Sequence, residues 1–181
     1  MSMDIGGSLF QRSLAFTMRW EGGYVNHPAD PGGATNKGVT QSVYDAWRRA
    51  KGLPTQSVRS ISSAEVREIY YQSYWEPHCA DFQWPLCLAL FDTRVNFGIR
   101  GAAFLVQPIV GATVDGIWGR QTQGLLLDCQ GRWGPQRLAG EIAAARLRYR
   151  VQRVSAAPNQ RVFLAGWINR DVDLFLEVIG R

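Results

Sequence analysis

The sequence has little of what several functional classes require. Its 181 residues include two histidines, His27 and His78, and three cysteines, Cys79, Cys87 and Cys129. None of them has Cys-x-x-Cys or His-x-x-x-His spacing, so we expect no bound metal and no cofactor. Three cysteines cannot pair completely, which favours folding in a reducing compartment with the thiols as small core residues.

Long apolar runs and strand-like alternation are also scarce. No run is long enough to span a membrane. Residues 1–19 carry Asp4 and lack the basic segment and small-residue cleavage site of a signal peptide. We therefore expect a protein without an integral membrane segment, made in the bacterial cytoplasm without a recognisable signal peptide. The length allows one domain or two small ones.

The net charge of +5 is concentrated near the end of the chain, where residues 131–181 contain nine arginines and four acidic residues. Four of these arginines follow one another closely: Arg146, Arg148, Arg150 and Arg153. Such a basic face suits anionic glycan, wall polymer, lipid headgroups or nucleic acid. No aromatic residues alternate with the arginines as base-stacking residues do, so we expect no nucleic-acid partner.

Helical patterns dominate and predict an all-α fold. The expected helices end near Met18, extend from Thr40 to Lys51, begin at the Ser62-x-x-Glu65 capping box, and cover residues 85–98, 102–110, 122–128 and 135–154, with two final segments through Trp167 and Phe175. Residues 24–40 are polar and rich in proline and glycine, which predicts a shaped loop or a short hairpin.

Glu21 stands where the first helix is expected to end. It follows Leu14 by seven residues and so continues the inward-facing stripe. Gly22 and Gly23 are expected to close the helix in left-handed conformations. A carboxylate at a helix C-terminus opposes the helix dipole, which favours the protonated form that a general acid needs. The alternative is an ordinary solvated glutamate at a helix end.

Residues 21–40 carry the motif E-G-G-Y-V-N-x-P-x-D-P-G-G-x-T-N-x-G-V-T, which resembles the glycoside hydrolase family 108 N-acetylmuramidases of the lysozyme superfamily. F-D-T-R-V-N-F-G at 91–98 resembles the second signature of that family. V-D-G-I-W-G at 114–119 and G-W-I-N-R at 166–170 resemble its peptidoglycan-binding region. Within the family, the chain most resembles muramidases that act as secretion activators, including the one serving typhoid toxin release.

The resemblance implies an organisation as well as an activity. Residues 1–98 would form a lysozyme-like catalytic domain with a small hairpin or loop after Glu21, and residues 99–181 a helical peptidoglycan-binding region. The implied partner is peptidoglycan, met in the periplasm or cell envelope by a monomeric protein.

Hydrolysis of a glycosidic bond usually needs an acid and a second group that attacks the sugar or activates water. The resemblance gives Glu21 the first role. Asp30 and Thr35 are the catalytic candidates for the second. Phage lysozymes of the superfamily space Glu, Asp and Thr by nine and six residues, whereas the spacings here are nine and five. Asp30 has an alternative role in capping a turn.

Six further residues are candidate substrate contacts: Tyr24, Asn36, Thr40, Asp92, Asn96 and Trp118. Asp92 and Asn96 lie one turn apart on a predicted helix, where they form either a cleft wall or a buried network that ties helices together. Trp118 stacks on a sugar or belongs to the core, and a tryptophan in a short helical module is more often core.

Three functions follow from these residues. The first is an N-acetylmuramidase that cleaves between N-acetylmuramic acid and N-acetylglucosamine. The second is a catalytically inactive wall-binding protein of the same fold, and the third is a basic nucleic-acid binder. Because a binder needs no poised acid, Glu21 and the intact polar loop favour the enzyme.

Overall fold

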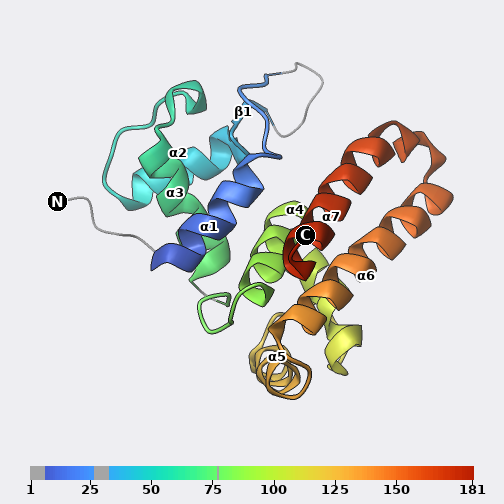
Figure 1. Ribbon diagram of the computed structural model, residues 1–181. Coiled ribbons are helices and arrows are strands. Elements are labelled where there is room, and N and C mark those ends of the chain that lie inside the picture. Colours follow the sequence, from blue (N-terminus) through green and yellow to red (C-terminus); the bar gives the residue numbers. More distant parts are fainter. Residues whose placement is uncertain (1–6, 27–32, 77) are drawn as a thin grey trace. The chain divides into compact units, whose positions relative to one another are not determined.

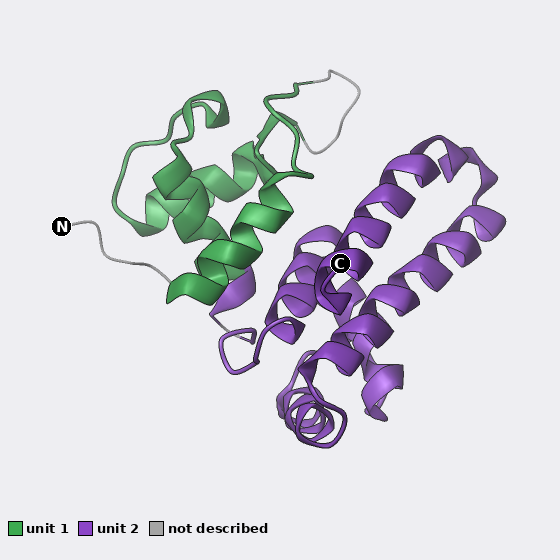
Figure 2. Cartoon of the chain, in the orientation of Figure 1, with its two compact units in different colours: residues 1–73 green, residues 74–181 purple. Residues whose placement is uncertain are grey.

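The computed structural model describes residues 7–26, 33–76 and 78–181, which form helices and one small β-hairpin (Figure 1). The predicted all-α fold is confirmed. The chain separates into two compact units, residues 1–73 and 74–181 (Figure 2). The predicted division after residue 98 lies inside the second unit.

Within the described ranges, none of the helices combines the length and the apolar character needed to cross a membrane.

Unit 1 is built from three helices and the hairpin. Its elements are α1 (Gly7–Met18), β1 (Thr35–Asn36), β2 (Val39–Thr40), α2 (Gln41–Ala50), the 3-10 turn η1 (Val58–Ser60) and α3 (Ser63–Tyr70). The buried residues of α1, which include Phe10 and Phe16, recur at helical spacing. The core of the unit therefore lies along one face of α1.

The predicted caps of unit 1 are confirmed. The Thr40 hydroxyl accepts a hydrogen bond from the Val43 amide (3.3 Å) and begins α2. At the start of α3, the Ser62 hydroxyl accepts from the Glu65 amide (3.2 Å), and the Glu65 carboxylate accepts from the Ser62 amide (2.8 Å). Glu65 also accepts from the Tyr44 hydroxyl (2.8 Å). The capping box is thus bonded to α2 as well as to its own helix.

In unit 2 the other helices pack against one long helix, α4 (Leu86–Val110). A π-helical turn, η2 (Tyr71–Trp75), spans the boundary after residue 73. The further elements of unit 2 are α5 (Arg120–Trp133), α6 (Pro135–Ala156), the 3-10 turn η3 (Pro158–Phe163) and α7 (Leu164–Ile179). Residues 86–94 of α4 are all buried. α6 and α7 lie side by side and are joined through η3 (Figure 1).

Two helix boundaries of unit 2 test the sequence patterns. The predicted stop at Gly98 is present, because this residue has φ 69° and ψ 168° within α4, a conformation that essentially only glycine adopts. The two predicted final segments are wrong. Trp167 and Phe175 lie in the single helix α7, since neither glycine nor proline interrupts the residues between them.

A buried ion-pair network ties α4, α6 and α7 together. Asp92 of α4 is fully buried, and its two carboxylate oxygens accept from Arg146 Nη1 of α6 (2.7 Å) and Arg170 Nη2 of α7 (2.7 Å). Asp171 accepts from Arg146 Nε (2.8 Å) and Arg150 Nε (3.1 Å). Burial by itself raises the pKa of Asp92, but attraction to Arg146 and Arg170 outweighs it and lowers the pKa to about 2.

The three cysteines are buried and free, as their number predicted. The Cys79 thiol donates to the Tyr74 carbonyl oxygen (3.3 Å). Burial raises the pKa of Cys79 to about 12, so the thiol is protonated at neutral pH.

Replacing Asp92 tests the network. Asp92→Asn should lower the free energy of unfolding by about 3–5 kcal/mol, because Arg146 and Arg170 would then be buried without their carboxylate. Chemical denaturation at pH 7 measures this loss. Asp128→Asn, at an exposed position of α5, is the matched control and should change stability little.

The same carboxylate makes stability depend on pH. Its folded pKa of about 2 lies below the ordinary value of 3.8, so its contribution is present above about pH 4 and is lost as the pH falls through about 2. Between pH 5 and about pH 2, the free energy of unfolding of the parent protein should therefore fall by more than that of Asp92→Asn. Identical pH profiles would contradict this assignment.

Candidate functional site

The end of α1 places Glu21 just beyond the last helical turn. Backbone bonds from Arg19 to the Phe16 oxygen (3.1 Å) and from Trp20 to the Thr17 oxygen (3.0 Å) tighten that turn. Gly22 and Gly23 are not in left-handed conformations, so the prediction that they close the helix in this way is wrong. The 3-10-type bonds end the helix before the glycines are reached.

The hairpin after Glu21 has a tip of two residues. Thr35 pairs with Thr40, and Asn36 pairs with Val39. Lys37 and Gly38 form the tip with φ of 50° and 74°. Positive φ at both positions is the requirement of the type I′ turn, whose twist matches that of the two strands. The predicted short hairpin is therefore present.

This tip is fixed against Glu21 by contacts on two sides. The Lys37 amide donates to the Gly22 carbonyl oxygen (3.1 Å), and the Tyr70 hydroxyl donates to the Lys37 carbonyl oxygen (3.1 Å). A Cβ on Gly38 would stand 2.1 Å from the Tyr70 hydroxyl oxygen and 2.7 Å from Glu21 Oε2. Only glycine therefore fits between the buried tyrosine and the carboxylate.

Glu21 is half-buried and lines a cavity of about 460 Å³ in unit 1. α1 and α3 supply most of the lining, and Lys37 and Arg67 add two cationic side chains. The lining of the cavity thus combines one carboxyl group with two cationic hydrogen-bond donors. Such a group can exchange a proton with a substrate oxygen.

The other predicted residues of this region have different environments. Thr35 is half-buried in β1, and its backbone pairs with Val25 on the side away from β2 (2.8 Å for both bonds). Tyr24 is exposed, and the Arg59 guanidinium lies 5.1 Å from its ring centroid. Thr40 caps α2. Asp30 lies outside the described residues.

Asn36 contributes to the architecture of the hairpin. Its side chain is buried, and Nδ2 donates to the carbonyl oxygens of Val58 and Arg59 (both 3.1 Å). These bonds join the hairpin to η1. The amide nitrogen is therefore engaged by the backbone rather than directed to a ligand.

In unit 2, Asp92 and Asn96 belong to a buried network, which is one of the two alternatives that the sequence left open. Both Asp92 oxygens accept from arginines, and Asn96 Oδ1 accepts from Arg150 Nη2. Trp118 is buried, and its Nε1 donates to Gln123 (3.0 Å), which agrees with the core interpretation of this tryptophan. The geometry gives Asp92 and Trp118 structural roles.

The site residues predicted from the sequence did not include Lys37, Gly38, Tyr70 or Arg67. The local signal for the tip was weak, because type I′ turns prefer Asn-Gly, Asp-Gly or Gly-Gly, whereas the tip here is Lys-Gly. The proximity of Tyr70 carried no local signal, since it lies far along the chain in α3. Within residues 7–26, 33–76 and 78–181, no three His, Cys, Asp or Glu side chains are grouped as metal ligands would be.

Comparison with known proteins identifies two regions of the chain. Residues 14–98 match the model of glycosyl hydrolase 108, and residues 101–172 match that of a predicted peptidoglycan domain. The chain therefore combines a glycosyl hydrolase 108 region with a peptidoglycan-domain region. No curated protein matches it significantly. Among solved structures it is similar to SagA of Brucella abortus, with 27% identity and a TM-score of 0.73 over 94% of each chain.

The two matched regions support a general activity. The protein is a glycoside hydrolase that acts on peptidoglycan, and its function belongs to the cell envelope. The first family region contains Glu21 and the hairpin, and the second contains α5, α6 and most of α7.

Replacing Gly38 tests the fixed position of Glu21. Gly38→Ala should lower activity on peptidoglycan by about a hundredfold, because the new Cβ displaces the Glu21 carboxylate or the Tyr70 hydroxyl. Gly52→Ala is the matched control. Gly52 also has a positive φ (69°), but no atom lies within 4 Å of its added Cβ. Gly52→Ala therefore introduces the backbone strain without the steric clash. Release of reducing ends from purified walls measures activity. Equal losses in both variants would assign the effect to strain.

Proposed function

We propose that the protein is an N-acetylmuramidase that hydrolyses the bond between N-acetylmuramic acid and N-acetylglucosamine, with Glu21 as the general acid. The observation that carries the proposal is the position of Glu21, whose carboxylate lines a cavity and lies against the glycine of a hairpin tip. Contacts to Gly22 and Tyr70 hold that tip in place. An acid held in this way can protonate the leaving oxygen without first paying the entropy of orientation.

The second catalytic group comes from the segment between Glu21 and the second strand. Asp30 and Thr35 are our candidates, and Thr35 lies in β1 of the hairpin that packs against Glu21. If Thr35 positions a water molecule on the face of the sugar opposite the acid, the reaction inverts the anomeric configuration. If Asp30 attacks the sugar, a covalent intermediate forms and the configuration is retained.

The proposed biological role is cutting of the wall to permit secretion of proteins such as toxins, or lysis. The motifs that resemble secretion-activator muramidases support this role, and so does the similarity to SagA over nearly the whole chain. Residues 99–181 would hold peptidoglycan in the periplasm while Glu21 performs the chemistry. We propose that the protein acts as a monomer and does not bind nucleic acid.

Glu21→Gln should abolish release of muropeptides from purified peptidoglycan. The amide has nearly the shape of the acid but cannot donate the proton, so the thermal midpoint should stay unchanged or rise as a charge opposing the helix dipole is removed. Zymography and chromatography of the released fragments measure activity. Glu76→Gln, at an exposed position, is the control and should retain full activity. Substantial turnover by Glu21→Gln would remove Glu21 from the catalytic role.

Asp30→Asn and Thr35→Ala separate the two candidates for the second group. A variant that loses the base or the group that positions water should lose at least about a hundredfold in turnover. Analysis of the anomeric form of the first product then distinguishes attack by Asp30 from activation of water by Thr35. A variant with normal turnover assigns that residue to the architecture of the loop.

A further inference from the structure

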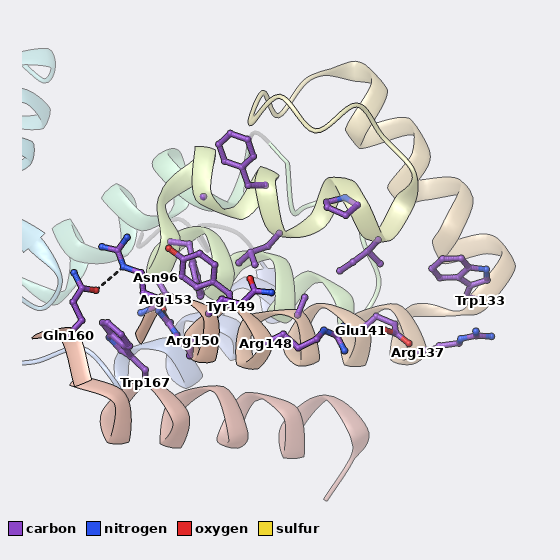
Figure 3. A pocket seen from close by; sticks show the side chains of 18 residues that line it. Asn96, Trp133, Arg137, Glu141, Arg148, Tyr149, Arg150, Arg153, Gln160 and Trp167 are labelled. Carbon is purple, nitrogen blue, oxygen red and sulfur yellow. Dashed lines mark hydrogen bonds and ion pairs between the residues drawn. The ribbon is translucent and has the colours of Figure 1, made fainter. Parts of the chain in front are cut away.

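A groove of about 870 Å³ crosses unit 2, far along the chain from the Glu21 cavity. One face of α6 forms its floor, and residues of α4, α5, η3 and α7 form its walls. Figure 3 shows Trp133 and Arg137 at one end, and Arg153, Gln160 and Trp167 at the other. From Arg137 to Arg153, α6 rises about 24 Å, at the usual rise per helical residue.

The groove combines aromatic rings with positive charge. Its lining includes four arginines and one acidic residue, Glu141. Phe97, Phe104, Trp133, Tyr149 and Trp167 supply aromatic surface, and Phe104 is 40% exposed. Aromatic and guanidinium groups together suit a ligand that has both apolar surface and carboxylates.

One arginine of the groove is already engaged by the protein. Arg150 donates to Asp171 and Asn96, and its guanidinium lies 4.1 Å from the Phe97 ring centroid and 4.9 Å from that of Trp167. The buried Asp171 therefore neutralises Arg150, and the Arg150 guanidinium packs against the rings of Phe97 and Trp167. Arg150 builds the wall of the groove rather than capturing an anion.

The other three arginines are directed to solvent. The side chain of Arg148 is 64% exposed, and the carboxylate of Glu141, which is also exposed, is 4.0 Å away. Such a surface pair is weak. Arg153 donates through Nε to Gln160 (2.8 Å), and a guanidinium has four further N–H donors. The Arg137 guanidinium lies over the Trp133 ring, 5.5 Å from its centroid.

The two parts of peptidoglycan differ in charge. Its sugars are neutral, because the lactyl carboxyl of muramic acid is consumed in the amide bond to the peptide, whereas the stem peptide carries free carboxylates. Three hydrated arginines along the floor of a groove favour the charged part. A length of about 24 Å accepts an extended peptide of about seven residues, which is enough for a stem peptide with part of its cross-link.

We propose that this groove binds the carboxylate-bearing stem peptide of peptidoglycan, with Arg137, Arg148 and Arg153 as the anion-binding residues. The inference rests on the proposed function, and it gives the substrate peptide a site separate from the Glu21 cavity. Phe104, Trp133 and Trp167 contact the apolar parts of the peptide. Binding should weaken with rising salt, because exposed charges are screened.

Binding of soluble muropeptides to the full-length Glu21→Gln protein tests the proposal. The probes are a disaccharide-tetrapeptide, the same compound with its carboxylates amidated, and a peptide-free glycan oligomer. By calorimetry, we expect the first to bind at least about tenfold more tightly than either of the others, as the loss of charge-assisted hydrogen bonds implies. Equal affinity for the amidated and free compounds, or for the peptide-free glycan, would overturn the proposal.

Matched variants locate the site. Arg137→Gln and Arg148→Gln combined should weaken binding of the disaccharide-tetrapeptide by about tenfold or more, with an unchanged thermal midpoint. Arg120→Gln, at an exposed arginine outside the groove, should bind like its parent. Unchanged affinity in the double variant would overturn the proposal.

The two proposals fail separately. A protein that binds the peptide in this way but leaves wall glycan uncut lacks the proposed muramidase activity and keeps the inferred site. A protein that cuts walls but binds all three probes alike keeps the activity and refutes the inferred site.

Discussion

Unit 2 depends on the neutralisation of one buried carboxylate. Asp92 is inaccessible to water, and isolated burial of such a charge would cost several kcal/mol. Arg146 and Arg170 satisfy both oxygens, so three helices must meet at this point for the charge to be tolerated. Asp92 lies in the part matched by the hydrolase model, whereas both arginines lie in the part matched by the peptidoglycan domain. The two family regions therefore share one interior within residues 74–181.

The arginine cluster of α6 illustrates how one helix serves two purposes. Arg146 and Arg150 lie one turn apart and face the core, where Asp92 and Asp171 neutralise them. Arg148 lies between them in sequence and points to solvent. The inward pair fixes the packing of α4 and α7, and the outward residues give the groove its charge. The positive surface is thus built on a rigid base, which lowers the entropic cost of binding a ligand there.

Short sequence signals predicted those structural features that depend only on neighbouring residues. The Ser62 capping box, the Thr40 cap and the break at Gly98 each depend on a few neighbouring residues, and all three are present. The conformation of Gly22 was predicted wrongly, because its carbonyl is held by the amide of Lys37 in the hairpin. The contact of Tyr70 with the hairpin tip joins residues 33 positions apart, which no local pattern reveals. The family motifs made Glu21 a candidate, but the contacts that hold the hairpin tip beside it came only from the fold.

The buried thiols have a consequence for a protein whose function belongs to the cell envelope. Disulfide exchange and oxidation require a thiolate that the oxidant can reach. Cys79, Cys87 and Cys129 are enclosed by the core, and the raised pKa of Cys79 keeps its thiol protonated. The folded chain therefore offers no cysteine to the oxidants of the cell envelope. Its structure requires neither the formation nor the reduction of a covalent cross-link.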